Sequence, residues 1–251
     1  MINFFRKTRK KLADNNQFFK YSRYAIVEIA LVVIGILIAL QINNWNSDRN
    51  EISKYKKQLL KVVESIKSDS IQLEKLKQSR LIVIDNTSQM MQELQNRNIM
   101  DSEVFLNLFL SMISEQKFIS DMDNSLKNQV ENYQSINIHE LLDGYEKMVE
   151  KIKFREFRHN EFSENMEVDL WKNGFFKAIR PKFIRQPGNN PSYISFKKLD
   201  LNKIGIYDDD ILFGWMLRSE MGYSWLILEY DLLIVKGEEV TKVINNFLND
   251  D

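Results

Sequence analysis

The stretch Tyr24-Ala-Ile-Val-Glu-Ile-Ala-Leu-Val-Val-Ile-Gly-Ile-Leu-Ile-Ala-Leu-Gln-Ile42 decides the fold of this chain. It is apolar apart from Glu28 and Gln41 and contains no proline. At the rise of an α-helix it extends over roughly 28 Å, which matches the hydrocarbon thickness of a bilayer. The sequence therefore predicts one transmembrane helix over residues 24–42.

The residues on either side of this helix predict its orientation. Tyr21 and Tyr24 lie at one end and Trp45 at the other, as interfacial aromatic anchors do. Residues 1–23 contain seven basic residues and one acid, a net charge of +6, although the net charge of the whole chain is zero. By the positive-inside rule, this basic arm is cytoplasmic and residues 43–251 lie on the other side of the membrane.

Two other interpretations of the apolar segment are less compatible with these flanks. A cleaved signal peptide also begins with basic residues, but its apolar core is shorter and ends in a small-x-small cleavage site. Here the segment ends in Gln-Ile-Asn-Asn-Trp-Asn instead. A buried core helix of a soluble protein would leave the charge bias and the aromatic flanks without a cause.

The anchor also resembles a known family. The run from Tyr24 to Asn46, behind the Phe-Phe-Arg-Lys start at residues 4–7, resembles the signature of a single-pass membrane family of Bacteroidota, domain of unknown function 6090. The match is specific over residues 2–46 and diffuse beyond, and Val27 stands where family members commonly have Gly. The resemblance implies an inner-membrane protein whose C-terminal domain is periplasmic, and it implies no activity.

Three residues of the predicted span are candidates for helix contacts within the membrane. Glu28 is an ionisable group inside a span, and such groups are candidate functional sites. It also lies one turn from Tyr24 and close to Arg23, so it can reach the cytoplasmic headgroups instead. Gly35 and Ala39 form a small-xxx-small pair that permits close approach of a second helix, which favours self-association or a protein partner.

The body beyond the membrane is expected to be mainly helical, since the chain has only three prolines and eight glycines. An amphipathic helix is predicted to continue the span to about residue 98, and Asp69 interrupts its apolar stripe. A face of an antiparallel bundle explains this stripe better than a coiled-coil stalk. Further helices are predicted over residues 104–113, after a cap at Asp101 or Ser102, and over 121–133, 139–171 and 211–248, with a connector at 135–138. Residues 225–235 are predicted to be the most buried part of the last helix. The predicted stripes consist of Ile52, Tyr55, Leu59, Val62, Ile66, Leu73 and Leu76 in the first helix, and of Leu141, Leu142, Tyr145, Val149, Ile152 and Phe157 in the fourth.

Residues 173–206 contain all three prolines and are predicted to form one long irregular loop, with a short strand at 193–196. Long loops in compact domains are often functional, and this one is basic and aromatic. Its candidate partner-facing residues are Phe176, Arg180, Phe183 and Arg185. The alternative is that its aromatic side chains pack over the ends of the helices.

The sequence offers no residues for catalysis, cofactor binding or metal binding. There is no cysteine, and His139 and His159 have no acidic or histidine partners at ligand spacing. The acids at residues 208–210 lack the spacing of a Ca²⁺ loop, and their place before a helix explains them. The excess of positive charge lies in the arm, whereas the folded part has a net negative charge, so no nucleic-acid partner is expected.

These observations lead to two hypotheses of function. The first is a non-enzymatic, membrane-anchored helical-bundle module of the bacterial cell envelope that acts in interaction or sensing. The alternative is an accessory subunit of an envelope transport or energy-coupled membrane complex that uses Glu28 in the membrane. In both, the expected partners are the lipid bilayer and a protein, or a second copy, that contacts the transmembrane helix.

Overall fold

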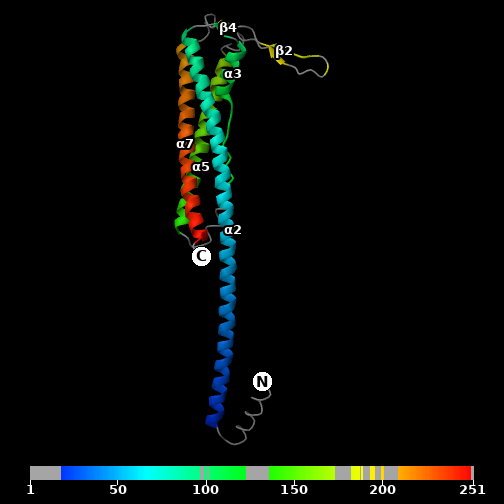
Figure 1. Ribbon diagram of the computed structural model, residues 1–251, viewed down its shortest axis with the longest axis vertical. Helices are drawn as coiled ribbons and strands as arrows, with labels where there is room; N and C mark the ends of the chain where they lie inside the picture. The colour runs from blue at the N-terminus through cyan, green and yellow to red at the C-terminus, as the bar shows by residue number, and fades with distance from the viewer. Residues whose placement is uncertain are drawn as a thin grey trace. The chain divides into compact units, whose positions relative to one another are not determined.

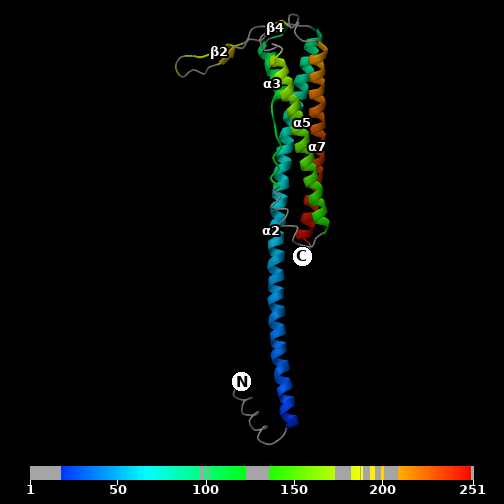
Figure 2. The same ribbon diagram turned by 180° about the vertical axis from the view of Figure 1, so that it is seen from behind.

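The computed structural model describes residues 18–96, 99–100, 102–122, 136–172, 182–186, 188, 193–195, 199–200 and 209–249. These residues are mainly helical, as the sequence predicts (Figures 1 and 2). The helices are α2 (Phe18–Asn96), α3 (Ser102–Ile113), α5 (Ile136–Lys172) and α7 (Asp209–Asn249). The chain divides into two compact units, Met1–Lys57 and Gln58–Asp251.

The first unit contains the N-terminal part of α2, which is the one helix in the described residues long and apolar enough to cross a membrane. Its apolar side chains from Ile26 to Ile42 are exposed on every side of the helix. Helix α2 continues without a break to Asn96, so the prediction of one helix from the span to about residue 98 is confirmed. Neither glycine nor proline occurs between the span and that end, and this explains the continuity.

In the second unit, the C-terminal part of α2 lies beside α5 and α7 (Figures 1 and 2). Side-chain contacts join Arg80 of α2 to Glu156 of α5 and to Tyr230 of α7. Asp69 contacts Tyr145 at earlier positions of the same two helices, so α2 and α5 run in the same direction, and the prediction of an antiparallel bundle is wrong for this pair. Lys77 contacts Asp231, and α7 therefore runs antiparallel to both. The core between the three helices is apolar and includes Leu59, Val62, Ile66, Leu73, Leu142, Tyr145, Ile152, Leu226, Tyr230 and Leu233.

An extended segment, residues 114–122, follows α3 and lies along α2 and α5; we call it the strap. Residues 121 and 122 are not helical, which corrects the start of the helix predicted over 121–133, whose remaining residues lie outside the described part. Helix α5 begins at Ile136, so the predicted connector at 135–138 is also wrong. Ile138 is buried, and its burial extends the apolar stripe of α5 by one turn.

The region predicted as a long irregular loop contains short strands. Strand β2 (Lys182–Ile184) pairs antiparallel with β3 (Tyr193–Ser195), with Lys182 opposite Ser195. Strand β1 (Ile99–Met100) pairs antiparallel with β4 (Leu199–Asp200). The predicted strand near residue 193 is confirmed, whereas β2 was missed. Its residues Lys182, Phe183 and Ile184 do not alternate in polarity, and three residues are too few for a periodicity signal.

The apolar stripes are confirmed in part. Tyr145, Val149 and Ile152 are buried as predicted, whereas the side chain of Phe157 is 63% exposed. Residues 225–235 were predicted to be the most buried part of α7, but only one face of this segment is buried. Trp225, Leu228, Leu232 and Val235 are exposed on the other face. The prediction failed because α7 is apolar on two faces, and only one of them packs against α2 and α5.

Candidate functional site

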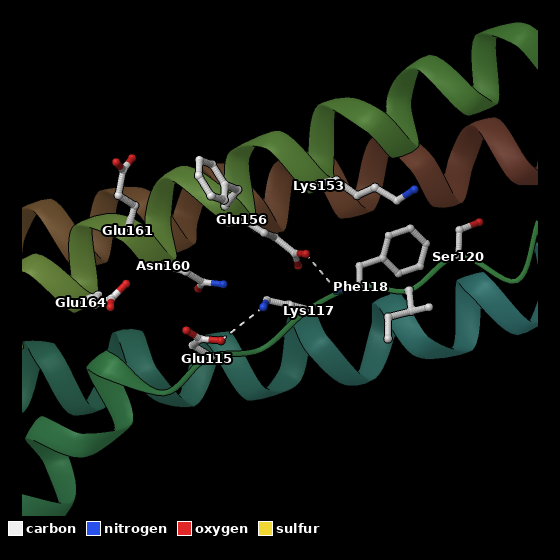
Figure 3. Close-up of a pocket in the computed structure, with 11 residues that line it drawn as sticks. Glu115, Lys117, Phe118, Ser120, Lys153, Glu156, Asn160, Glu161 and Glu164 are labelled. Carbon is white, nitrogen blue, oxygen red and sulfur yellow. Dashed lines mark hydrogen bonds and ion pairs between the residues drawn. The ribbon is translucent and has the colours of Figure 1, made fainter.

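A groove of about 580 Å³ lies between the strap and α5 in the second unit. Figure 3 shows side chains of α5 on one side of it and those of the strap on the other. Phe118 and Glu156 are buried at its base. The other lining residues are Glu115, Lys117, Ile119, Ser120, Lys153, Phe157, Asn160, Glu161 and Glu164. We call this hollow the strap groove.

A buried ion pair lies directly beneath the strap groove. The guanidinium Nη2 of Arg80 is 3.2 Å from Glu156 Oε1, and both side chains are at most 3% exposed. Tyr230 donates its hydroxyl hydrogen to the same Oε1 at 2.5 Å, and Arg80 Nε donates to the Tyr230 hydroxyl oxygen at 2.8 Å. Burial raises the pKa of Tyr230, so the hydroxyl stays protonated as this donation requires. One residue from each of α2, α5 and α7 thus forms a closed polar network in the core.

The same network holds the strap in place. Glu156 Oε2 accepts a hydrogen bond from the backbone N–H of Phe118 at 2.9 Å, and Arg80 Nη2 donates to the carbonyl of Gln116 at 3.0 Å. An extended segment without a strand partner needs such acceptors and donors, since a buried backbone group without a hydrogen bond is costly. Because Glu156 accepts from the strap, Arg80 and Tyr230, we assign this carboxylate a structural role.

Asp69 fixes the other end of the strap. Its carboxylate accepts hydrogen bonds from Ser120 Oγ at 2.5 Å, from the backbone N–H of Asp121 at 2.6 Å and from the Tyr145 hydroxyl at 2.9 Å. Burial raises the pKa of Asp69, and the three hydrogen bonds oppose that increase. In the sequence this residue only interrupts an apolar stripe. The structure shows that Asp69, the residue that interrupts the stripe, is the residue to which the strap attaches.

Two further hydrogen bonds join the strap to α2. The backbone N–H of Ile119 donates to Gln72 Oε1 at 2.7 Å, and Gln116 Nε2 donates to Ser79 Oγ at 2.6 Å. Every one of these acceptors belongs to α2, as Asp69 does. The strap is therefore positioned by the side chains of one helix along its length and by Glu156 of α5 at its centre. This arrangement keeps the strap groove open between the strap and the outer face of α5.

The rim of the strap groove carries both signs of charge. Glu115 pairs with Lys117 at 3.4 Å on the strap side, and Lys153 and Glu164 lie along α5 (Figure 3). The amide nitrogen of Asn160 is buried, has no hydrogen-bond partner among the described residues, and points toward the strap in Figure 3. Exposed apolar surface from Ile119 and Phe157 completes the rim. Such a surface suits a short zwitterionic or peptide-like ligand.

A narrower groove of about 160 Å³ lies between α5 and α7 and is lined in part by Arg158, Arg218 and Trp225. At its base the ring of His159 packs 4.1 Å from the ring of Tyr223, centroid to centroid. Burial, then the nearby Arg80 and Arg218, lower the pKa of His159 from 6.5 to about 4. The ring fits only because residue 222 is glycine: a Cβ at Gly222 would lie 2.3 Å from His159 Nδ1.

Of the candidate residues predicted from the sequence, those that the structure describes with their side chains do not line these two grooves. Glu28 is partly exposed on α2. The other candidates on this helix are exposed: Tyr24, Gly35, Ala39 and Trp45. The guanidinium of Arg49 lies 5.9 Å from the ring centroid of Trp45.

The remaining candidates are placed only in part. The side chains of Tyr21 and Phe183 are outside the description, and so are Phe176 and Arg180 as a whole, whereas Arg185 follows β2 and is exposed. Sequence reasoning missed Arg80, Glu156 and Asn160, because each looks like an ordinary polar residue of an amphipathic helix. Among the described residues, no three His, Asp or Glu side chains are grouped as metal ligands.

Comparison of the chain with family models, with curated proteins and with solved structures gives no match.

Proposed function

We propose that the protein is a membrane-anchored interaction or sensing module of the bacterial cell envelope, without catalytic activity of its own. The basic N-terminal arm is cytoplasmic, residues 24–42 cross the inner membrane, and the helical bundle formed by the later part of the chain is periplasmic. The resemblance of residues 2–46 to the single-pass family supports this placement. The strap groove is the surface that binds the ligand or partner segment.

The observation that carries the proposal is the dual role of α2. One helix contains the exposed apolar span and also Asp69 and Arg80, the residues that position the strap. Exposed apolar surface of this extent is unfavourable in water and favourable in a bilayer. A membrane anchor and a recognition surface therefore share one continuous secondary-structure element.

The chemistry of the strap groove supports binding more than catalysis. Its central carboxylate, Glu156, is neutralised by Arg80 and is fully used by hydrogen bonds. Its rim offers separated ammonium and carboxylate groups, an unpaired amide donor and apolar side chains. These groups match the charged ends and the backbone of a peptide-like ligand.

The proposal predicts that a photo-crosslinking amino acid at position 119 captures the occupant of the strap groove in intact cells. Ile119 is 68% exposed on the groove rim, and Ile71, which is 60% exposed on α2 and does not line the groove, is the matched control. We expect a specific adduct from position 119 and none from position 71, read by gel shift and mass spectrometry. Equal adducts from both positions, or none from position 119, would contradict the assignment of the groove.

The proposal also predicts that Glu28→Gln leaves the protein functional. The substitution removes a charge and keeps the size of the side chain, and the proposed module needs no proton coupling in the membrane. We expect unchanged amounts in the membrane fraction and an unchanged adduct at position 119. Normal insertion with loss of the adduct would instead favour the alternative, an accessory subunit of an energy-coupled complex.

A further inference from the structure

Helix α7 carries an apolar stripe on its outer face that takes no part in the core. Its side chains are separated by four, three, four and three residues and are between 45% and 63% exposed: Met221, Trp225, Leu228, Leu232 and Val235. The core face of the same helix is formed by other residues, among them Leu226, Tyr230 and Leu233. We call the five exposed residues the outer stripe.

The spacing of the outer stripe is that of a heptad repeat, with Trp225 and Leu232 at position a and Met221, Leu228 and Val235 at position d. Residues at these positions form the seam between two paired helices. The next positions of the same register are charged residues, Arg218 before the stripe and Glu239 after it, and the stripe ends there. It is therefore a bounded seam of about two heptads.

The charged groups on the two sides of the outer stripe have opposite net charges. On the α5 side, Lys151 and Arg155 both contact the single carboxylate of Glu229 at 3.0 Å, leaving one positive charge in excess. On the α2 side the single ammonium of Lys77 contacts two carboxylates, those of Glu74 at 3.6 Å and Asp231 at 2.7 Å. That side has one negative charge in excess.

We propose that a second copy of this chain packs against the outer stripe, with the two α7 helices parallel. In a parallel pair the α5 side of one chain faces the α2 side of the other, so the excess charges attract at both edges of the seam. The same register places Asp231 of one chain opposite Lys236 of the other, as g and e positions of successive heptads. An antiparallel pair would instead bring each positive side against its own copy.

The size of the seam fits a pair of tethered chains. A stable interface between free proteins buries roughly 800 Å² on each partner, which five side chains approach only with help from neighbours. Phe154 of α5 supplies exposed apolar surface beside Trp225, with which it lines the narrow groove. The proposed membrane anchor raises the effective concentration of the second copy, so a modest seam suffices.

The absence of cysteine from the sequence makes a direct test possible. Single cysteines are introduced into the full chain at Leu228 and Leu232 of the outer stripe, and at Ser224 and Glu238 as exposed controls on the same helix beside the stripe. Membranes from cells that make each variant are oxidised mildly, and covalent dimers are measured on non-reducing gels. Helical content by circular dichroism verifies that each purified variant folds.

A disulfide requires Cβ atoms about 4 Å apart, a distance that equivalent a or d positions of a parallel pair approach and that g positions do not. We expect at least about tenfold more dimer from Leu228→Cys and Leu232→Cys than from Ser224→Cys and Glu238→Cys. Equal dimer at all four positions, or none at the stripe, would overturn the proposal. Dimer at Leu228→Cys alone would indicate an antiparallel crossing and would also overturn it.

The amount of each variant in the membrane fraction is measured in the same experiment. Loss of membrane association with stripe-specific dimers would contradict the proposed anchoring and leave the pairing intact. Membrane association without stripe-specific dimers would contradict the pairing and leave the proposed anchoring intact. The two proposals therefore fail separately.

Discussion

Replacing Arg80 with methionine lowers the free energy of unfolding by about 3–5 kcal/mol, the usual cost of removing one partner from a buried ion pair. The substitution keeps much of the apolar stem of the side chain and removes the guanidinium. Glu156 then remains buried with an uncompensated charge, and the Gln116 carbonyl and the Tyr230 hydroxyl lose their donor. Urea denaturation of the full chain in mild detergent, followed by circular dichroism at 222 nm, measures the change.

Two further variants separate this effect from a general loss of side-chain contacts. Arg158→Met breaks an exposed pair with Glu161 at 3.1 Å, and such pairs contribute at most about 1 kcal/mol. The double variant Arg80→Met, Glu156→Gln removes the buried charge but keeps an amide oxygen for the N–H of Phe118, so it should be more stable than Arg80→Met alone. If Arg158→Met were as destabilised as Arg80→Met, the buried network would not be the cause.

The second large effect is a loss of stability in acid that depends on His159. The pKa of this imidazole is lowered to about 4 in the folded protein, from 6.5 for an unperturbed side chain. Between these two values the unfolded chain binds a proton at His159 that the folded chain does not, so stability falls as the pH falls. The size of the shift corresponds to about 3 kcal/mol between pH 6.5 and pH 4, fully present above 6.5.

The variant His159→Gln cannot titrate and is small enough to lie against Gly222. The difference between the two proteins isolates His159 from other groups, including Asp69, whose raised pKa has the opposite effect because it favours the folded state in acid. We expect the wild-type protein to lose stability relative to the variant as the pH falls from 6.5 to 4. Parallel pH profiles for the two proteins would show that His159 is not buried in its neutral form.

The parts of the fold that the sequence predicts well are those set by local pattern. The apolar run and the lack of breakers determine α2 from the span to its end, and the stripe at Tyr145, Val149 and Ile152 determines the buried face of α5. The predicted boundaries at residues 121 and 139 were wrong, because the strap and the start of α5 depend on contacts made elsewhere in the chain. Phe157 has the spacing of a core residue, yet it is exposed at the rim of the strap groove.

The candidate site could not be predicted, because its partners are far apart in the sequence. Arg80 and Glu156 are separated by 76 residues, and each alone resembles a solvated residue on a helix. Asp69 was visible as a break in an apolar stripe, and such a break in a buried face is a usable signal for a polar network. The outer stripe of α7 was visible as apolar residues, but the sequence does not show which of two apolar faces enters the core.

The separation of these partners also has a consequence for biosynthesis. The ribosome makes the span first and Arg80 soon afterwards, whereas Tyr230 follows 150 residues later. During that interval Arg80 lacks the hydroxyl to which its Nε donates a hydrogen bond in the folded chain. Helix α7 therefore completes this core, so a chain truncated before α7 lacks one partner of Arg80 and is expected to be degraded faster than the full chain.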